Sequence, residues 1–311
     1  MSLKQDLRDK HFVVTGANTG IGFATAREIA KMGGTVTMAC RSEARGKAAL
    51  EKLRQEALEK PVKEVLDLGS LQSVIDFAER MRSSGTKIDV LVNNAGVLGS
   101  PERQETADGF ELHIGVNHFG HHLLSRLLEP SIVDGGRTVF LTSLVHEGVP
   151  GAHKTRLEWD NINFEKPDSF ETYEAYGRSK LANILDAKEF GKRLAPRGII
   201  TYAVHPGMVA TELARSAGTT EDSPLALRLV LSAKSFMRSI SLSPIEGSLT
   251  TLKCSVDPEL AKAEISGKYW ADMKETQPSA LASDPENPPR YWAVTEEMLE
   301  TKLGKKAGEL I

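Results

Sequence analysis

A tyrosine and a lysine in this sequence are spaced so that they can move a proton together. Tyr176 and Lys180 are four residues apart, and Ser143 lies upstream at the end of an apolar, strand-like run. Residues at i and i+4 share one face of a helix, so we expect the Lys180 ammonium on the same side as the Tyr176 hydroxyl. A nearby cation favours the phenolate and lowers the pKa of a tyrosine, which is ordinarily near ~10. The trio is therefore a candidate centre for general acid–base catalysis.

The elements that position these groups follow a β/α alternation as far as about residue 205. Short β-branched runs alternate with amphipathic helical patterns, which predicts a doubly wound parallel sheet with helices on both faces. The runs are continuously apolar, as in strands covered on both faces. The predicted strands are Phe12–Thr15, Thr35–Ala39, Val62–Leu66, Ile88–Val92, Thr138–Thr142 and Ile199–Val204. The clearest helical patterns are Ala24–Met32, Ser42–Leu58 and Leu71–Met81, and a last helix is predicted near Thr295–Leu303, after a proline-rich stretch.

Composition excludes several other classes of protein. The chain has 311 residues, of which 40% are hydrophobic and 26% charged, so it can bury a large core. A net charge of −3 gives no indication of a nucleic-acid partner. Cys40 and Cys254 suggest neither a disulfide framework nor a metal site. No signal-peptide core and no apolar stretch near ~20 residues is visible, so we expect one cytoplasmic domain over residues 1–311.

Glycines directly follow the first predicted strand, in the run Thr15–Gly22. They allow a tight turn and let the backbone approach a pyrophosphate at the N-terminus of the next helix. The spacing is G-x-x-x-G-x-G rather than the general G-x-G-x-x-G, and a glycine cluster can also be a turn alone. The strand before and the helix after favour a nucleotide site in a Rossmann-type domain. The residues expected there are Gly16, Asn18, Thr19, Gly20, Ile21 and Gly22.

The end of the second predicted strand indicates which cofactor binds. An NAD site usually has a carboxylate here for the ribose hydroxyls, and this chain has none. Arg41 takes that place, with Arg45 and Lys47 one turn further on. A guanidinium suits an adenosine 2′-phosphate because it donates two charge-assisted hydrogen bonds. A solvated arginine at a helix start is the alternative, but we expect NADP(H).

With these motifs in place, the chain resembles the short-chain dehydrogenases/reductases over essentially its whole length. The further shared motifs are Asp67-Leu68, Asn93-Asn94-Ala95-Gly96, Asn117, Ser143, Tyr176 with Lys180, and Pro206-Gly207. Within the family it is similar to the retinol dehydrogenase branch in the runs Val116–His121, Tyr176–Asn183, His205–Leu213 and Ser266–Trp270. The resemblance implies NADP(H) and a lipophilic alcohol, aldehyde or ketone. Relatives that act on other carbonyl compounds share the same motifs.

The resemblance also implies roles for single residues. Tyr176 would protonate the developing alkoxide during hydride transfer, and Ser143 would donate a hydrogen bond to the same oxygen. Lys180 would lower the pKa of Tyr176 and bind the nicotinamide ribose, and Asn117 would hold a water that links Lys180 to solvent. Besides the glycine run, the expected cofactor contacts are Arg41, Asp67, Leu68, Asn93, Ala95, Gly96, Tyr176, Lys180, Pro206, Gly207, Val209 and Thr211. Asp67 could instead be a helix cap.

Two groups of residues leave alternatives open. His118, His121 and His122 have the i, i+3, i+4 spacing of metal ligands. They lack a carboxylate or further ligand at a recognisable spacing, so we predict a helix surface or subunit contact and no metal. The long loop His146–Thr172 carries the aromatic residues Trp159, Phe164 and Phe170. It is either a wall of the substrate pocket or an ordinary surface insertion, and His146 could line the pocket or cap backbone groups.

A helical substrate lid is expected within residues 208–243. Apolar residues in Leu225–Ile240 follow helical spacing and are interrupted by Arg228, Lys234 and Arg238. A peripheral membrane contact and simple core packing are the alternatives. The resemblance also makes a homodimer through the helices of Asn117 and Tyr176 possible.

The leading interpretation is an NADP-dependent oxidoreductase that acts on CH–OH and carbonyl groups. A catalytically silent NADP-sensing or scaffold protein is the alternative from another class. Family members of that kind tend to lose the tyrosine or the lysine, and this chain keeps both. A sugar-nucleotide epimerase shares the Tyr-x-x-x-Lys motif, but it usually has a different glycine spacing and a larger C-terminal domain.

Overall fold

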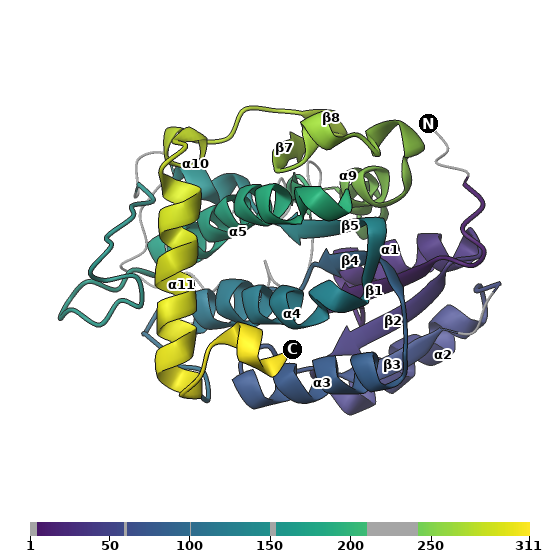
Figure 1. Ribbon diagram of the computed structural model, residues 1–311, viewed down its shortest axis with the longest axis horizontal. Helices are drawn as coiled ribbons and strands as arrows, with labels where there is room; N and C mark the ends of the chain where they lie inside the picture. The colour runs from purple at the N-terminus through teal and green to yellow at the C-terminus, as the bar shows by residue number, and fades with distance from the viewer. Residues whose placement is uncertain (1–4, 59–60, 100, 150–153, 210–241) are drawn as a thin grey trace.

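One twisted sheet organises the molecule (Figure 1). The computed structural model describes residues 5–58, 61–99, 101–149, 154–209 and 242–311. The sheet has eight strands in the order β3-β2-β1-β4-β5-β6-β7-β8, parallel from β3 to β7, with β8 antiparallel to β7. The strands are β1 (His11–Thr15), β2 (Thr35–Cys40), β3 (Val62–Val65), β4 (Ile88–Asn93), β5 (Ile132–Leu141), β6 (Ile200–His205), β7 (Lys268–Ala271) and β8 (Lys274–Glu275). The predicted doubly wound parallel sheet is confirmed.

Helices cover both faces of the sheet and form two hydrophobic cores. One face is covered by α1 (Gly20–Lys31), α2 (Glu43–Arg54) and α9 (Pro244–Val256). The other is covered by α3 (Leu71–Ser83), α4 (Gly120–Leu128), α5 (Thr172–Leu194) and α11 (Asn287–Leu303). A π-helical segment, η1 (Ile114–Phe119), leads into α4, and a short helix, α10 (Ala280–Ser283), precedes α11. Within the described parts of the chain, no helix is long and apolar enough to cross a membrane.

Three sequence-based expectations about strands need correction. β3 is not covered on both faces: it is the edge strand, and Val62 and Val65 are exposed. β5 begins at Ile132 rather than at Thr138, because the Asp-Gly-Gly stretch that reads as a turn continues the strand, with a register shift in its pairing to β4. β7 and β8 were not predicted from the sequence, since both are too short to show a pattern.

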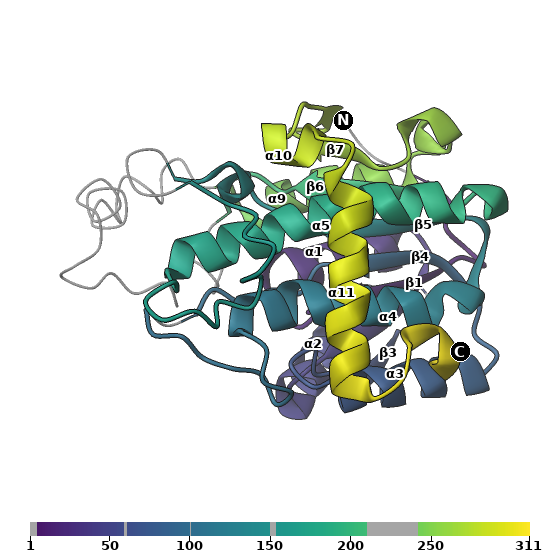
Figure 2. The ribbon, with the colours of Figure 1, turned by 60° about the vertical axis from the view of Figure 1, so that its left-hand side comes forward.

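The last helix also begins earlier than predicted. α11 starts at Asn287, and Pro288 and Pro289 lie in its first turn. Proline is tolerated there because the first turn of a helix has no intrahelical partner for its N–H groups. Figure 2 shows α11 lying across α5 and α4. The homodimer considered above would use the helices of Asn117 and Tyr176. Where α11 crosses these helices, it covers their outer faces.

The three histidines of η1 and α4 are buried, His118 and His122 beneath α11 and His121 against β1. His118, His121 and His122 are at most 1% exposed. The prediction of a helix surface or subunit contact was wrong. The helix that covers His118 and His122 lies more than 160 residues away in sequence, so its contacts leave no local pattern. The predicted lid, between β6 and α9, falls mostly outside the described residues.

Candidate active site

A cavity of about 670 Å³ opens at the carboxyl ends of the strands. It lies where the strand order reverses between β1 and β4, which is the usual ligand site of a doubly wound sheet. Segments that follow each of the first five strands contribute to it, together with Tyr176 and Lys180 of α5. The predicted site residues that line it are Gly16, Asn18, Thr19, Gly20, Ile21, Gly22, Arg41, Asp67, Leu68, Ala95, Gly96, Tyr176, Lys180 and Pro206.

The glycine run forms the turn between β1 and α1. Gly16 and Gly20 have φ of 65° and 57°, a region that favours glycine. A Cβ on Gly22 would lie 2.4 Å from Asn94 Nδ2 and 2.6 Å from the Gly16 carbonyl oxygen, so no larger residue fits. Thr19, the N-cap of α1, makes no side-chain cap, and the first turn has no acidic residue. The N–H groups at this helix end can therefore bind an anion such as a pyrophosphate.

Thr15, at the end of β1, connects the glycine turn to the segment after β4. Its hydroxyl oxygen accepts hydrogen bonds from the backbone N–H groups of Asn94 and Ala95, both at 2.9 Å. His121 Nδ1 donates to the Asn117 carbonyl, so its Nε2 accepts from the Thr15 hydroxyl at 2.9 Å. Burial lowers the pKa of His121 to about 3, so the ring is neutral. His121 thus acts as a hydrogen-bonding support beneath the cavity.

Asn93, one of the expected cofactor contacts, does not line the cavity. It is fully buried, and its Nδ2 donates to Ser125 Oγ of α4 at 2.9 Å. Successive strand residues point to opposite sides, so Asn94, the next residue, lines the cavity in its place. Asn94 Nδ2 donates to the Thr15 carbonyl at 2.7 Å. Both asparagines belong to the same sequence motif, which does not show which of the two faces the ligand.

Positive charge gathers at the β2 end of the cavity. Arg41 and Arg45 line it, both are exposed, and neither pairs with an acidic group among the described residues. Lys47 does not line the cavity and instead pairs with Glu43 at 2.9 Å. Asp67 lines the cavity from the next strand and accepts a hydrogen bond from Gly69 N at 2.9 Å. It does not cap α3, whose N-cap is Ser70.

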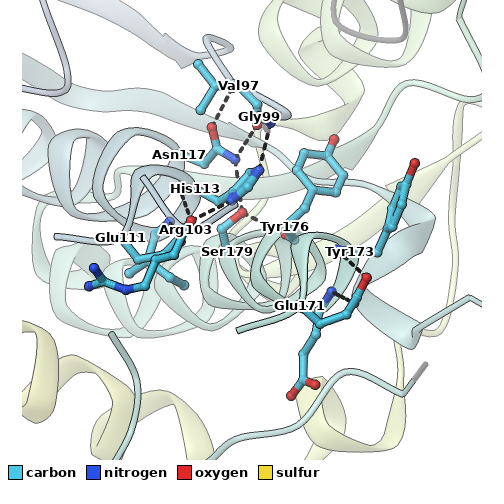
Figure 3. A network of polar contacts seen from close by, with 12 residues as sticks. Val97, Gly99, Arg103, Glu111, His113, Asn117, Glu171, Tyr173, Tyr176 and Ser179 are labelled. Atoms are coloured by element: carbon cyan, nitrogen blue, oxygen red, sulfur yellow. Dashed lines mark hydrogen bonds and ion pairs between the residues drawn. The ribbon is translucent and has the colours of Figure 1, made fainter. Parts of the chain in front are cut away.

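The candidate acid–base group lies at the opposite end. Tyr176 and Lys180 are buried on one face of α5, and the Ser143 hydroxyl is hydrogen-bonded to the phenol. Lys180 Nζ donates to the Leu141 carbonyl at 3.2 Å and lies 5.7 Å from the centre of the Tyr176 ring. The Asn117 amide exchanges two hydrogen bonds with the backbone of Val97, of 2.7 and 3.1 Å. All four predicted catalytic residues therefore come together at this end (Figure 3 shows Tyr176 and Asn117).

The charge states of this pair differ from the expectation. Burial raises the pKa of Tyr176 to about 12, and the hydrogen bond from Ser143 only partly offsets this rise. Burial also lowers the pKa of Lys180 to about 8. The predicted lowering of the Tyr176 pKa by Lys180 is not seen, because the ammonium bonds to Leu141 and removal from water dominates. The structure thus holds a neutral phenol, the form that can donate a proton.

Of the predicted contacts after β6 that the structure describes, only Pro206 lines the cavity. Gly207 packs on Leu242, where a Cβ would lie 2.7 Å from Leu242 Cδ1. Val209 forms a β-bridge with Leu242. Thr211 lies outside the described residues.

The aromatic residues of the loop before α5 do not wall the cavity. Phe164 packs against Arg178, whose guanidinium lies 3.9 Å from the centre of its ring. Trp159 packs between Tyr291 and Arg290 of α11. His146 caps backbone groups: it bonds to the Ser143 carbonyl at 2.7 Å and accepts from Ser279 N at 3.0 Å. It thus connects the candidate catalytic serine to the C-terminal segment.

The buried histidine cluster is an ion-pair network. Asp186 of α5 lies 3.0 Å from His122 Nδ1 and 3.3 Å from His118 Nδ1, so a carboxylate is present that the sequence did not reveal. These three groups lie within metal-binding reach of one another, yet a structural zinc site needs a fourth ligand, and the cluster of described residues has three. Burial disfavours a charged His122, but Asp186 and Glu296 outweigh it and raise its pKa to about 9. An imidazolium between two carboxylates accounts for the site.

Comparison with known proteins agrees with this geometry. A family model described as short chain dehydrogenase matches residues 10–154. Retinol dehydrogenase 12 of Mus musculus is 38% identical over 293 residues, with 93% of this chain and 86% of that protein covered. Retinol dehydrogenase 13 of Homo sapiens is 37% identical, with 93% and 84% covered. A solved structure of an uncharacterized protein from Mycobacterium paratuberculosis has a TM-score of 0.73 at 28% identity, over 98% of this chain and 97% of that chain.

Proposed function

We propose that this chain, which belongs to the short-chain dehydrogenase family and is similar to its retinol dehydrogenases, is an NADP(H)-dependent oxidoreductase for lipophilic aldehydes, ketones or alcohols. The observation that carries the proposal is the geometry of the cavity. At one end lie a helix N-terminus without a side-chain cap and two guanidinium groups that pair with no acidic residue in the described part of the chain. At the other end lies a neutral buried phenol with its serine and lysine.

The choice of NADP(H) rests on charge. Arg41 and Arg45 face the cavity just beyond β2, where a carboxylate would hold the ribose hydroxyls of NAD. Neither arginine is neutralised by a described acidic group, so both are available to a 2′-phosphate. The backbone of the glycine turn lines the cavity, and the first turn of α1 has no acidic residue and no side-chain cap that would compete with a pyrophosphate. These residues fit the phosphate groups of NADP(H).

The choice of a lipophilic substrate rests on the wall beside Tyr176. Val97, Leu98 and Leu112 line this part of the cavity. Leu144 and Met208 follow the ends of the paired strands β5 and β6 and are about half exposed, at 52% and 50%. The apolar lining residues Val97, Leu98 and Leu112 favour a substrate with an extended apolar part, and the exposed Leu144 and Met208 add apolar surface at the same edge of the sheet.

The chain's own residues supply the proton chemistry. When bound, the nicotinamide supplies or accepts the hydride. In reduction, Tyr176 donates its proton to the carbonyl oxygen, and the Ser143 hydroxyl stabilises the negative charge that develops there. Lys180 lies on the same helical face and can resupply the proton through the polar groups around Asn117. In oxidation the steps run in reverse: the phenol first passes its proton to solvent through the polar groups around Lys180 and Asn117, and the phenolate then accepts the proton of the alcohol.

Steady-state turnover on a panel of carbonyl compounds tests the proposal. The panel includes retinal, a medium-chain aldehyde, an aromatic ketone and a short, water-soluble aldehyde, each with NADPH and NADH. We expect oxidation of NADPH with the lipophilic compounds and weaker activity with NADH. Tight NADPH binding without turnover on any compound would instead support a cofactor-sensing or scaffold protein.

A further inference from the structure

The wall of the cavity beside Tyr176 is held by a buried histidine that is outside the expected catalytic set. We propose that His113, oriented by Glu111, is a positioning residue that fixes the Val97–Gly99 segment and so sets the fit of bulky lipophilic substrates. This inference rests on the proposed function, because it concerns the substrate end of the same cavity. It assigns His113 no direct contact with the reacting atoms.

Hydrogen bonds fix the proton on the His113 ring. The backbone N–H of Gly99 donates to His113 Nε2 at 2.8 Å (Figure 3). Since an amide N–H can only donate, Nε2 carries no proton, and the ring proton lies on Nδ1. Nδ1 then donates to Glu111 Oε1 at 2.6 Å. The ring is therefore held in one tautomer and one orientation, with its acceptor aimed at the cavity wall.

Glu111 is itself firmly held. Its carboxylate accepts the backbone N–H groups of His113 and Ile114, both at 3.0 Å, at the start of the helical segment. Its own N–H donates to Asn163 Oδ1 at 2.6 Å. Both Glu111 and His113 are buried, at 0% and 1% exposure, which makes their hydrogen bonds costly to leave unmade. The dyad is thus a rigid support and not a mobile surface pair.

The segment that His113 supports is pinned at two points from one helix. Asn117, four residues later on the same helical face, holds Val97 by two hydrogen bonds, and His113 holds Gly99 (Figure 3). Asn117 also donates to Ser179 Oγ at 3.0 Å, which ties it to α5. The two contacts have different roles. Asn117 holds Val97 on the side of Lys180, and His113 holds Gly99 in the apolar wall.

The ring also contacts the proton donor. Its centre lies 6.2 Å from that of Tyr176 at 78°, an edge-to-face packing, and 6.4 Å from that of Phe170 at 22°. A Cβ on Gly99 would lie 3.1 Å from Leu112 Cδ2, so the wall is closely packed where His113 holds it. Losing the Nε2 acceptor would release the wall next to Tyr176 while Asn117 and Lys180 keep their partners. The expected consequence is weaker substrate binding rather than slower chemistry.

Two substitutions separate this role from a purely structural one. In His113→Gln the side-chain oxygen can still accept from Gly99 N–H, whereas His113→Leu keeps the bulk and removes the acceptor. We expect His113→Leu to raise KM for retinal or another bulky aldehyde by about 5–10-fold, the worth of one buried hydrogen bond, with kcat and the KM for NADPH within about twofold. The glutamine variant should recover most of the loss. His11→Leu is the matched control, because this histidine bonds to Thr37 within the sheet, away from the cavity.

Three results would overturn the proposal. His113→Leu could leave the KM for the aldehyde unchanged, or it could change kcat and the KM for NADPH as much as the KM for the aldehyde. The third is a His113→Gln variant that does not restore the KM for the aldehyde. Histidine ¹⁵N shifts and amide exchange in the wild type give a readout independent of activity and of the leucine variant's folding. A protonated Nδ1, an unprotonated Nε2 and a protected Gly99 amide are expected. The opposite tautomer with an unprotected Gly99 amide would contradict the positioning role. If the wild-type protein turned over no carbonyl compound, the proposed function would be wrong. The NMR result would still show whether the Gly99 N–H bonds to His113 Nε2.

Discussion

The two ends of the cavity are built in different ways. The cofactor end consists of backbone turns close to the strands they follow, and its main requirement is space: glycines where a Cβ would collide, and an uncapped helix N-terminus. The substrate end is held by side-chain bonds between segments far apart in sequence, such as His146 to Ser279 and Asn117 to Ser179. The first kind of construction leaves a motif in the sequence. The second leaves isolated histidines and asparagines whose partners only the fold reveals.

The largest effect is expected at the substrate end. Tyr176→Phe removes the phenolic proton donor and keeps the ring that packs against His113. We expect kcat to fall by about 10²–10⁴-fold, the usual contribution of a general acid, with the Kd for NADPH nearly unchanged. Pre-steady-state rates and a fluorescence titration with NADPH separate the two quantities. Near-wild-type turnover by the Tyr176→Phe variant would show that Tyr176 is not the proton donor.

At the cofactor end, the largest effect should come from loss of space. In Gly22→Ala the new methyl group would collide with Asn94 Nδ2 and the Gly16 carbonyl. Overpacking of this kind costs about 1–3 kcal/mol, so we expect the Kd for NADPH to rise by about 5–140-fold. Gly308→Ala is the matched control, because the nearest atom to its Cβ, Arg126 Nη2, is 3.8 Å away. Equal NADPH affinity in wild type and Gly22→Ala would show that the turn is not the phosphate site.

A charge reversal sharpens the assignment of the cofactor. Arg41→Asp should lower the preference for NADPH over NADH by about 10-fold or more, since a charge-assisted hydrogen bond contributes about 1.5–3 kcal/mol. The ratio of kcat/KM for the two cofactors measures it. Lys47→Asp makes the same charge change outside the cavity and should leave this ratio near the wild-type value. If Arg41→Asp has no effect, Arg45 becomes the residue to test.

The smallest effect concerns the buried lysine and its dependence on pH. The pKa of Lys180 is lowered to about 8 from 10.5, so the unfolded chain binds more protons between these values and stability should rise with pH across them. Below pH 8 the buried ammonium destabilises the fold, so Lys180→Met should raise Tm at pH 7 by a few degrees, about 3 kcal/mol at most, while it lowers activity. Thermal unfolding from pH 7 to 10 checks this. A Tm below that of the wild type at pH 7 would contradict the burial of a charged lysine.

The same comparison explains what the sequence could predict. The parallel sheet followed from apolar runs such as Phe12–Thr15, and the glycine turn from residue types that only such a turn requires. The sequence could not tell Asn93 from Asn94, because the direction of each side chain depends on where the strand ends. Nor could it give the pKa of Tyr176, because burial acts against the neighbouring lysine and is set by the whole fold.

The buried histidines show most clearly what could not be predicted from the sequence. From their spacing alone, His118 and His122 were placed at a surface, since nothing local indicates that α11 returns to cover them. Asp186 and Glu296, their partners, are more than 60 residues away in sequence. The role of His113 was missed for the same reason: its partner at the wall is a backbone N–H, which has no signature in the sequence.

Isotope transfer tests the central claim most directly. Wild-type protein is incubated with NADPH deuterated at C4 of the nicotinamide and with a lipophilic aldehyde such as retinal, and the alcohol product is analysed by mass spectrometry and NMR. The account predicts deuterium on the carbinol carbon with wild type and little or no product with Tyr176→Phe. Alcohol without deuterium on that carbon, or equal deuterated product from the phenylalanine variant, would contradict it.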